Sequence, residues 1–232
     1  MRLLPSALLR ARTEAASAYA RATLPGRRTP WREASWCAVD LELTGLDPNV
    51  DEIISFGAIP IEDGRVQLAD GVYELVRPVS EISEESIRVH GIRAVDLAHA
   101  PPLAEAIETL LGAIAGRILV VHVAAVERSF LGRALRYDGV RLRGPLVDTE
   151  VLGKLWLHEH EGRPLRHVEL GNLASALGLP ADRPHDALGD ALTTAQVFIA
   201  LASHLDTIRG ETVGSLARAS SRLESLRRLN WG

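Results

Sequence analysis

The most constraining feature of this sequence is an apolar run that carries two acidic residues two positions apart. Residues 36–43 read WCAVDLEL, so Asp40 and Glu42 lie inside the run, and a second apolar run follows over residues 53–61. This pattern predicts two neighbouring strands joined by a loop. Side chains two apart on a strand point to the same face, where two carboxylates repel each other and resist burial. The pair therefore indicates either a solvated strand end or a site for a divalent cation.

The remaining patterns predict an α/β fold. Two more strands are expected at residues 72–76 and 117–122. Helices are expected over residues 1–23, 101–115, 124–137, 149–157, 170–177, 187–205 and 211–229, with short helical pieces within 80–98 and a polar loop at 158–167. The first three strands follow one another with short turns, which indicates an antiparallel meander rather than a β–α–β unit. We therefore expect a mixed sheet flanked by helices.

Length and composition are typical of a protein with one core in a reducing compartment. The 232 residues, 47% of them hydrophobic, suffice for one sizeable core with short appendages. Cys37 is the only cysteine, which rules out an internal disulfide. No apolar run approaches the roughly 18 residues that a membrane span needs. The first nine residues resemble a signal peptide, but Arg10, Arg12 and Glu14 interrupt the apolar region, so we expect a cytoplasmic protein without a membrane partner.

The net charge of −4 conceals basic ends and an acidic middle. Residues 1–33 carry a balance of +5 and residues 205–232 a balance of +2, so the residues between them carry −11. An acidic body argues against passive binding of phosphate, which needs a basic surface, but it is compatible with an acidic metal pocket. The arginines of the two ends could contact phosphates, although solvated helix faces are the simpler explanation.

Two further segments contain residues suited to catalysis. In residues 185–190, HDALGD, His185 lies in a loop and Asp190 inside the helix that follows. A loop histidine can collect a proton and release it to solvent, whereas a surface histidine beside an N-cap at Asp186 is the simpler explanation. In residues 122–131, HVAAVERSFL, Glu127 falls in the first turns of a helix, where the helix dipole, Arg128 or a metal could account for it.

Taken in order, these segments resemble the motifs of the DEDD-type 3′–5′ exonucleases of the ribonuclease-H-like superfamily, in the branch with a histidine in its last motif. The first motif is DLELTG at residues 40–45, the second is residues 122–131, and the third is His185 with Asp190. Residues 89–92 and 148–149 also resemble family segments. The resemblance implies a mixed five-stranded sheet flanked by helices. It also divides the chain into a basic N-terminal helix and linker (1–33), an exonuclease domain (34–204) and a C-terminal helical extension (205–232).

The resemblance also implies a role for each matched position. His185 would be the general base that takes a proton from the attacking water. The acids of the three motifs would hold two divalent ions, Mg²⁺ or Mn²⁺: Asp40, Glu42, Glu127 and Asp190. The residues expected near the terminal nucleotide belong to the first two motifs: Thr44, Gly45, Leu46 and Phe130.

Elementary chemistry is consistent with these roles. Hydrolysis of a phosphodiester needs a nucleophile at neutral pH and a sink for charge on phosphorus, and two divalent ions ~3.5–4 Å apart can provide both. Carboxylate oxygens suit Mg²⁺ and Mn²⁺. The main departure is Glu127, because the family has an aspartate there and the glutamate side chain is longer by ~1.5 Å. Val123 also replaces a polar residue common in the family.

We therefore expect an enzyme that releases nucleoside 5′-monophosphates from the 3′ end of single-stranded or frayed nucleic acid, with DNA favoured over RNA. Two alternatives stay open. One is an RNA-directed exonuclease, and the other is a non-catalytic subunit that binds a polymerase or nucleic acid, in which Glu127 marks a decayed site. A DNA polymerase subunit and a second copy of the chain are both expected partners by family analogy, which does not choose between them.

Overall fold

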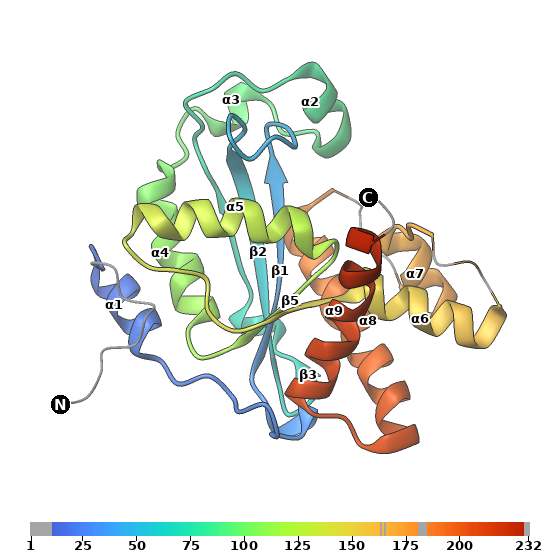
Figure 1. Cartoon of the computed structure of the whole chain (residues 1–232). Helices are drawn as coiled ribbons and strands as arrows, with labels where there is room; N and C mark the ends of the chain where they lie inside the picture. Colours follow the sequence, from blue (N-terminus) through green and yellow to red (C-terminus); the bar gives the residue numbers. More distant parts are fainter. Residues whose placement is uncertain (1–10, 163, 165, 181–184, 230–232) are drawn as a thin grey trace.

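The computed structural model describes residues 11–162, 164, 166–180 and 185–229, which Figure 1 draws in colour. Within this part of the chain, one mixed sheet runs in the order β3–β2–β1–β5–β6, and β4 pairs with another part of β2. Its strands are β1 (Trp36–Leu43), β2 (Ile53–Glu62), β3 (Arg65–Val66), β4 (Val72–Leu75), β5 (Ile118–Val121) and β6 (Leu146–Asp148). β2 is antiparallel to β1, β3 and β4, whereas β5 is parallel to β1 and β6. The expected combination of a meander with parallel strands is confirmed.

The sheet has six strands, one more than the five expected. The difference lies in a tight hairpin after β2. Asp63 and Gly64 both have positive φ, 52° and 67°, as the central residues of a type I′ turn require, so β3 folds back directly onto the end of β2. β6 is only three residues long and follows Gly144 and Pro145, so its sequence carries too short an apolar run to predict a strand.

The helices confirm the expected order of elements. They are α1 (Glu14–Arg21), α2 (Glu84–His90), α3 (Ala94–Leu97), α4 (Leu103–Ile114), α5 (Ala124–Tyr137), α6 (Thr149–Glu161), α7 (Leu170–Ala176), α8 (Ala187–Arg209) and α9 (Val213–Leu229). The expectation of a polar loop from residue 158 was wrong, because α6 continues to Glu161 and ends where Gly162 adopts a left-handed φ of 63°. Residues 1–10 of the predicted N-terminal helix lie outside the described residues.

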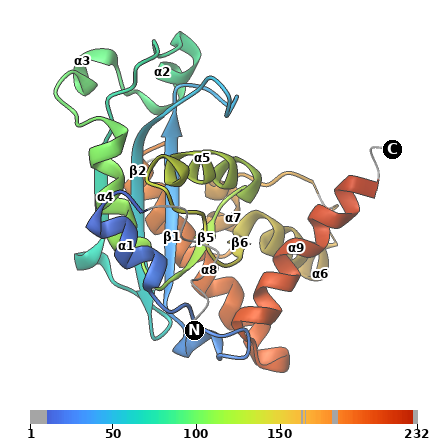
Figure 2. The ribbon, with the colours of Figure 1, turned by 60° about the vertical axis from the view of Figure 1, so that its left-hand side comes forward.

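Helices cover both faces of the sheet and form a separate core on each (Figures 1 and 2). On one face, α1, α4 and α5 pack against odd-numbered side chains of β1 such as Val39 and Leu41. On the other face, α6, α7 and α8 pack against the even-numbered Trp36 and Ala38. Because side chains alternate across a strand, Asp40 continues the face that α8 covers.

The described parts of both terminal segments pack against the body of the chain. Tyr19 of α1 is buried in the first core. Trp31, just before β1, is buried in the second core, where its ring lies 6.1 Å from that of Phe198. Leu216 of α9 joins the same core. Among the described residues, the helices contain no stretch with the length and hydropathy of a membrane span.

A glycine in β2 allows the first turn of α8 to lie directly on the sheet. Gly57 pairs with Asp40 across the β1–β2 ladder. A Cβ atom at this position would lie 2.1 Å from the carbonyl oxygen of Ala187 and 2.6 Å from the Cα atom of Leu188. Backbone atoms cannot move aside cheaply, so only glycine permits this approach. Gly57 therefore sets the distance between the start of α8 and the acids of β1.

We predict that Gly57→Ala lowers the free energy of unfolding by about 1–3 kcal/mol, because the added methyl group forces α8 away from the sheet. Urea unfolding followed by circular dichroism would measure the change. Gly112→Ala is the matched control, since this exposed glycine in α4 has no heavy atom within 4 Å of an added Cβ. The control should stabilise the protein by about 0.5–1 kcal/mol. Equal stability of Gly57→Ala and the wild type would contradict the close approach.

Candidate active site

The candidate site lies at the carboxyl ends of the parallel strands β1 and β5, where α5 and α8 begin. The pairing of β1 with β5 ends at Ala38 and Val120. Asp40 and Glu42 therefore lie beyond the last residue of β1 that β5 covers, although β2 still pairs with them on the other side. Ligand sites in open α/β sheets commonly lie outside the carboxyl ends of strands. Glu127 of α5 and Asp190 of α8 lie near this uncovered part of β1, since the charges of both act on Asp40.

The start of α5 is held by a carboxylate from the neighbouring strand. Asp148, at the end of β6, accepts hydrogen bonds from the backbone N–H groups of Val123 (3.2 Å) and Ala124 (2.9 Å). It also caps α6 by accepting from the N–H of Glu150 at 2.9 Å. Val123 has a φ of 65°, a left-handed conformation that β-branched residues rarely adopt. This turn places Glu127 in the first turn of α5, with its side chain only 5% exposed.

The start of α8 brings His185 and Asp190 together. His185 has a φ of 65°, and its backbone N–H donates to Oδ2 of Asp190 at 2.7 Å. Asp186 is the N-cap and accepts from the N–H groups of Leu188 and Gly189, each at 3.1 Å. The predicted cap at Asp186 is therefore confirmed, and it does not exclude a catalytic position for the histidine. The left-handed φ and this hydrogen bond hold the backbone of His185 against the first turn of α8.

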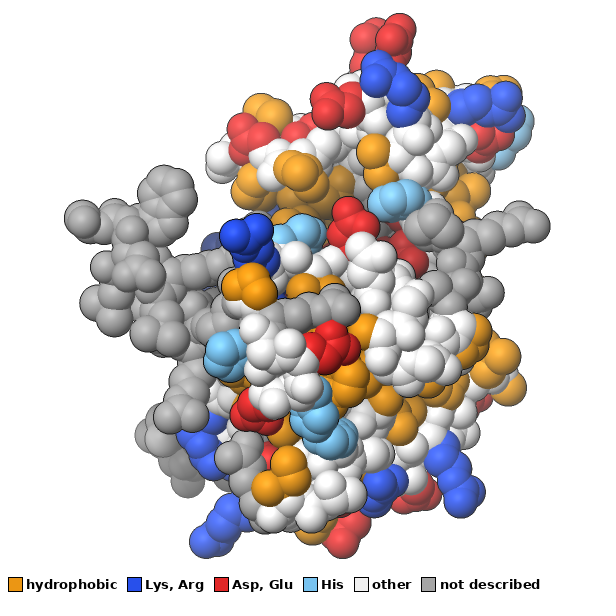
Figure 3. Space-filling model, turned by 90° about the vertical axis from the view of Figure 1, so that its right-hand side faces the viewer, with side chains coloured by type: hydrophobic (Ala, Val, Ile, Leu, Met, Phe, Trp, Pro, Cys, Tyr) orange, Lys and Arg blue, Asp and Glu red, His pale blue; other side chains and the backbone are white. Residues whose placement is uncertain are grey.

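Three of the predicted site residues converge closely. Glu42, His185 and Asp190 each offer a ligand atom, and these atoms all lie within 4.8 Å of one another. On the face shown in Figure 3, acidic side chains and histidines gather side by side near its middle, beneath a lobe with exposed apolar side chains. Asp40 belongs to the same group, because the charges of Glu127, Asp190 and Glu42 all act on it.

The carboxylates of the site are buried close to one another, and this raises their pKa values. Burial raises the pKa of Glu42 to about 7, and the charges of Asp190 and Asp186 add to the effect. The pKa of Asp40 is raised well above its ordinary value by burial and then by the charge of Glu127. Burial, and next the charge of Glu42, likewise raise the pKa of Glu127.

The donor set fits a divalent cation. None of the ion pairs between described residues includes Asp40, Glu42 or Glu127. Oε2 of Glu127 is buried and has no hydrogen-bond partner among the described residues. A buried carboxylate oxygen without a partner is costly, and a bound cation would remove that cost together with the mutual repulsion. Carboxylates with one imidazole nearby are suited to hard, oxygen-preferring ions.

Two of the residues predicted to contact the terminal nucleotide line a cavity beside Glu42. Gly45 and Leu46 line this cavity of about 420 Å³, and Leu46 is 76% exposed. Thr44 is buried, and its hydroxyl accepts from the N–H of Glu52 at 3.0 Å, so its side chain shapes the loop rather than the cavity. The opposite wall comes from α2, whose contributing residues sequence reasoning did not assign: Ser86, Val89 and His90. The family-like segment at residues 89–92 includes Val89 and His90, whereas no sequence signal indicated Ser86.

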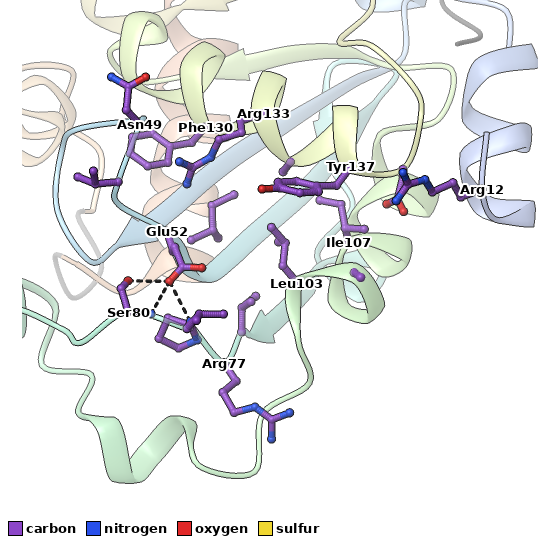
Figure 4. A pocket seen from close by; sticks show the side chains of 18 of the residues that line it. Arg12, Asn49, Glu52, Arg77, Ser80, Leu103, Ile107, Phe130, Arg133 and Tyr137 are labelled. Carbon is purple, nitrogen blue, oxygen red and sulfur yellow. Dashed lines mark hydrogen bonds between the residues drawn. The ribbon is translucent and has the colours of Figure 1, made fainter. Parts of the chain in front are cut away.

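Phe130 lies away from the cavity beside Glu42, so its position does not favour the predicted contact with the terminal nucleotide. Its ring is 1% exposed and belongs to the core beneath α5. Figure 4 shows it beside Arg133 at a different and larger cavity, of about 760 Å³, that none of the four acids lines. Glu52 borders the same cavity, where its Oε2 accepts from the N–H and the hydroxyl of Ser80 at 2.7 and 2.6 Å. Because α5 turns Phe130 into the core, its ring does not line the cavity beside Glu42.

Comparison with known proteins gives the same picture. The RNase_T family model, described as exonuclease, matches residues 37–198. The chain is 36% identical over 170 residues to the DNA polymerase III PolC-type of Thermotoga petrophila. This alignment covers 73% of this chain and 12% of that protein. It is 34% identical over 177 residues to the DNA polymerase III subunit epsilon-like protein of Rhodobacter capsulatus, covering 75% and 24%. The chain thus spans only 12% of the length of the first curated relatives that it matches.

Solved structures show the same fold at low sequence identity. Exonuclease X in complex with 5′ overhanging duplex DNA has a TM-score of 0.60 and 21% identity, covering 80% of this chain and 99% of that one. The nuclease domain of 3′hExo, a DEDDh family member bound to rAMP, has a TM-score of 0.59 and 19% identity, covering 77% and 95%. The family match spans more than half of the chain and includes every residue of the acidic cluster. The chain therefore belongs to the RNase_T exonuclease family.

Proposed function

We propose that the protein hydrolyses single-stranded or frayed DNA from its 3′ end and releases nucleoside 5′-monophosphates. The observation that carries this proposal is the convergence of Glu42, His185 and Asp190 within 4.8 Å. Asp40 and Glu127 lie close enough for the charges of this group to act on both. Membership of an exonuclease family supports the reaction class. The relatives named as DNA polymerase III proteins favour DNA as the substrate.

We propose that the acids of the cluster hold two divalent ions, Mg²⁺ or Mn²⁺. The ligands would be Asp40, Glu42, Glu127 and Asp190. Such ions activate a water molecule and stabilise the charge that develops on the phosphoryl group. The buried oxygen of Glu127 that has no partner among described residues supports its inclusion, although the family has the shorter aspartate there.

His185 would take the proton of the attacking water. Its side chain is exposed at the start of α8, yet it offers a ring nitrogen within 4.8 Å of the carboxylates of Glu42 and Asp190. A histidine in this position can accept a proton inside the site and lose it to solvent. The 2.7 Å hydrogen bond from its backbone N–H to Asp190 keeps His185 beside that carboxylate.

The cavity beside Glu42 is the proposed place for the 3′-terminal nucleoside. Leu46 and Val89 line it from opposite sides, and both are exposed apolar side chains that can contact a base or sugar without reading sequence. The hydroxyl of Ser86 donates to the carbonyl oxygen of Thr44 at 2.6 Å, which ties α2 to the loop after β1. The two walls of the cavity are therefore fixed relative to each other and to the acids.

The names of the relatives and of the solved structures support the proposals for substrate sugar, partner and location. RNA is the alternative substrate, because one protein of the same fold is bound to rAMP. A DNA polymerase subunit is the favoured partner, since the relatives carry DNA polymerase III names. A homodimer is the alternative, and a cytoplasmic location follows from the proposed replication role. A non-catalytic binding subunit remains the rival function, and Glu127 is the residue that tests it.

A degradation assay tests the reaction itself. With Mg²⁺ or Mn²⁺, a 5′-labelled single-stranded DNA should give a ladder that shortens from the 3′ end. EDTA and Asp40→Ala should each abolish the ladder, because both remove metal binding from the cluster. RNA of the same sequence and length serves as the matched substrate. A strand that stays intact with wild-type protein through a long incubation would refute the proposed activity.

The length of the Glu127 side chain separates a working site from a decayed one. Glu127→Asp withdraws the carboxylate by ~1.5 Å, and we expect it to lower the rate of hydrolysis about 100-fold, since a displacement of ~1 Å can cost that much. Steady-state rates on a single-stranded oligonucleotide would measure the loss. Glu105→Asp, at an exposed position of α4, should leave the rate unchanged. Activity that appears only in Glu127→Asp would instead favour the binding subunit.

The raised pKa of Glu42 predicts how stability depends on pH and metal. Its pKa is about 7 in the folded protein against an ordinary 4.5, so the folded state binds the proton more tightly than the unfolded state does. The corresponding stability is present below pH ~4.5 and is lost as pH rises to ~7. In EDTA, the free energy of unfolding of wild type relative to Glu42→Gln should therefore fall over this range, on the order of 2–3 kcal/mol.

Divalent cations should reverse this loss. Mg²⁺ binds ionised carboxylates, so it should raise the melting temperature more at pH 7.5 than at pH 5. Differential scanning calorimetry of both proteins, with Mg²⁺ and with EDTA, would measure the effect. An equal rise at the two pH values, or an equal rise in Glu42→Gln, would show that Mg²⁺ does not act through Glu42.

A further inference from the structure

A group of arginines forms a second charged surface, away from the acidic cluster. Two adjoining cavities share Arg128 and Gly144 in their linings. One is about 320 Å³ and is also lined by Arg136 and Arg141, and the other is about 390 Å³ and is also lined by Arg27 and Arg218. No acidic residue lines either cavity among the described residues. We call this surface the arginine groove; its members are Arg27, Arg128, Arg136, Arg141 and Arg218.

The groove is assembled from three segments that are far apart in the sequence. Arg128 and Arg136 lie two helical turns apart on α5 with Gly132 between them, so the three share one face of the helix. Arg27 precedes β1, and its carbonyl oxygen accepts from the N–H of Gly214 at 2.8 Å. This bond fixes the start of α9 beside the N-terminal linker, and α9 then carries Arg218 into the groove. Figures 1 and 2 show α9 and α5 on neighbouring parts of the surface.

The positive charge of the groove is not neutralised within the described chain. All five arginines are exposed, and none takes part in an ion pair between described residues. Other arginines are paired, for example Arg117 with Glu62 at 2.9 Å and Arg93 with Asp96 at 3.0 Å. Several guanidinium groups without acids between them repel one another unless a polyanion lies among them. Their planar donors are suited to phosphate.

The groove and the acidic cluster both take residues from α5, but Glu127 is buried and Arg128 is exposed on a face about 100° away. Arg128 follows Glu127 directly, and Arg136 lies about 12 Å further along α5 at 1.5 Å per residue. That distance is roughly the rise of three or four nucleotides along one strand of a duplex. A span of this length therefore separates the turn of α5 that holds Glu127 from the last arginine of the helix.

We propose that the arginine groove binds the phosphodiester backbone of the substrate strand, at nucleotides on the 5′ side of the bond that is cleaved. This inference rests on the proposed function, since it makes the groove an extension of the same substrate site. Two of its arginines, Arg27 and Arg218, lie outside the residues that match the family, 37–198. The terminal segments of this chain therefore contribute to holding the strand. Backbone contacts carry no sequence information, so the groove would increase affinity for long strands without selecting their sequence.

Binding without hydrolysis is the first test. The full chain in EDTA is titrated into a 5′-fluorescein 20-nucleotide single strand, DNA or RNA, and anisotropy is followed at several salt concentrations. Arg136→Gln with Arg141→Gln should weaken binding about tenfold at low salt. It should also reduce the slope of log K against log salt by about 1.4, or ~0.7 per lost phosphate contact. The same loss with DNA and RNA is expected, because the shared backbone is what binds.

A charge-matched double variant distinguishes the groove from net charge. Arg65→Gln with Arg77→Gln removes two exposed arginines that line neither cavity, and it should leave affinity and salt slope within twofold of wild type. Equal weakening by the two double variants would overturn the proposal, because binding would then follow net charge alone. Unchanged affinity in Arg136→Gln with Arg141→Gln would overturn it as well.

Hydrolysis of short and long substrates locates the contact along the strand. The groove variant should hydrolyse a dinucleotide at the wild-type rate but show a KM for the 20-nucleotide strand raised about tenfold. A loss on the dinucleotide would overturn the assignment to upstream nucleotides. Absence of hydrolysis by every protein, together with the expected binding result, would refute the proposed function and leave binding by the groove standing.

Discussion

The constraint on which the structure depends is repulsion among carboxylates held together at the end of β1. Two like charges 4 Å apart interact by about 4 kcal/mol at the effective dielectric of a protein surface. A chain free to relax would separate Asp40, Glu42 and Asp190. Instead each acid is fixed by an element that is anchored elsewhere, and burial first, then the charges of the neighbouring acids, raise the pKa values of Asp40 and Glu42. A bound divalent cation would replace the repulsion among these carboxylates with attraction to the ion.

The anchors of the site are distinct from the groups that do chemistry. β2 pairs with β1 across from the acids, and Gly57 lets α8 rest on that pair. Asp148 holds the start of α5, and its own backbone N–H donates to the hydroxyl of Ser220 on α9 at 2.7 Å. His122 bridges two further segments, with its ring nitrogens 2.9 Å from the hydroxyl of Thr149 and from the carbonyl oxygen of Val168. The site is therefore held in place by residues other than the four acids and His185.

The sequence predicted those features that depend on periodicity and failed on those that depend on backbone geometry. The common face of Asp40 and Glu42 follows from strand alternation alone. The approach of His185 to Asp190 does not, because five helical positions separate their directions by about 140°, and only the left-handed φ at His185 closes that gap. The inward direction of Phe130 depends on how α5 packs. The arginine groove was hidden for the same reason, since no pattern places Arg27 and Arg218 beside α5.

Both charged surfaces include residues of α5, and the charges at the two ends of this helix suit its dipole. Glu127 lies in its first turn and Arg136 in its last, where the helix dipole favours an acid and a base respectively. The dipole contributes only about 0.3–1 kcal/mol at each end, less than the ~4 kcal/mol between close like charges. Burial and neighbouring acids therefore dominate at Glu127, whose pKa is raised despite its favourable position. At the other end, no acid among the described residues lines the cavity that the arginines border. One helix thus carries an acid of the proposed metal site in its first turn and an arginine of the proposed strand-binding groove in its last.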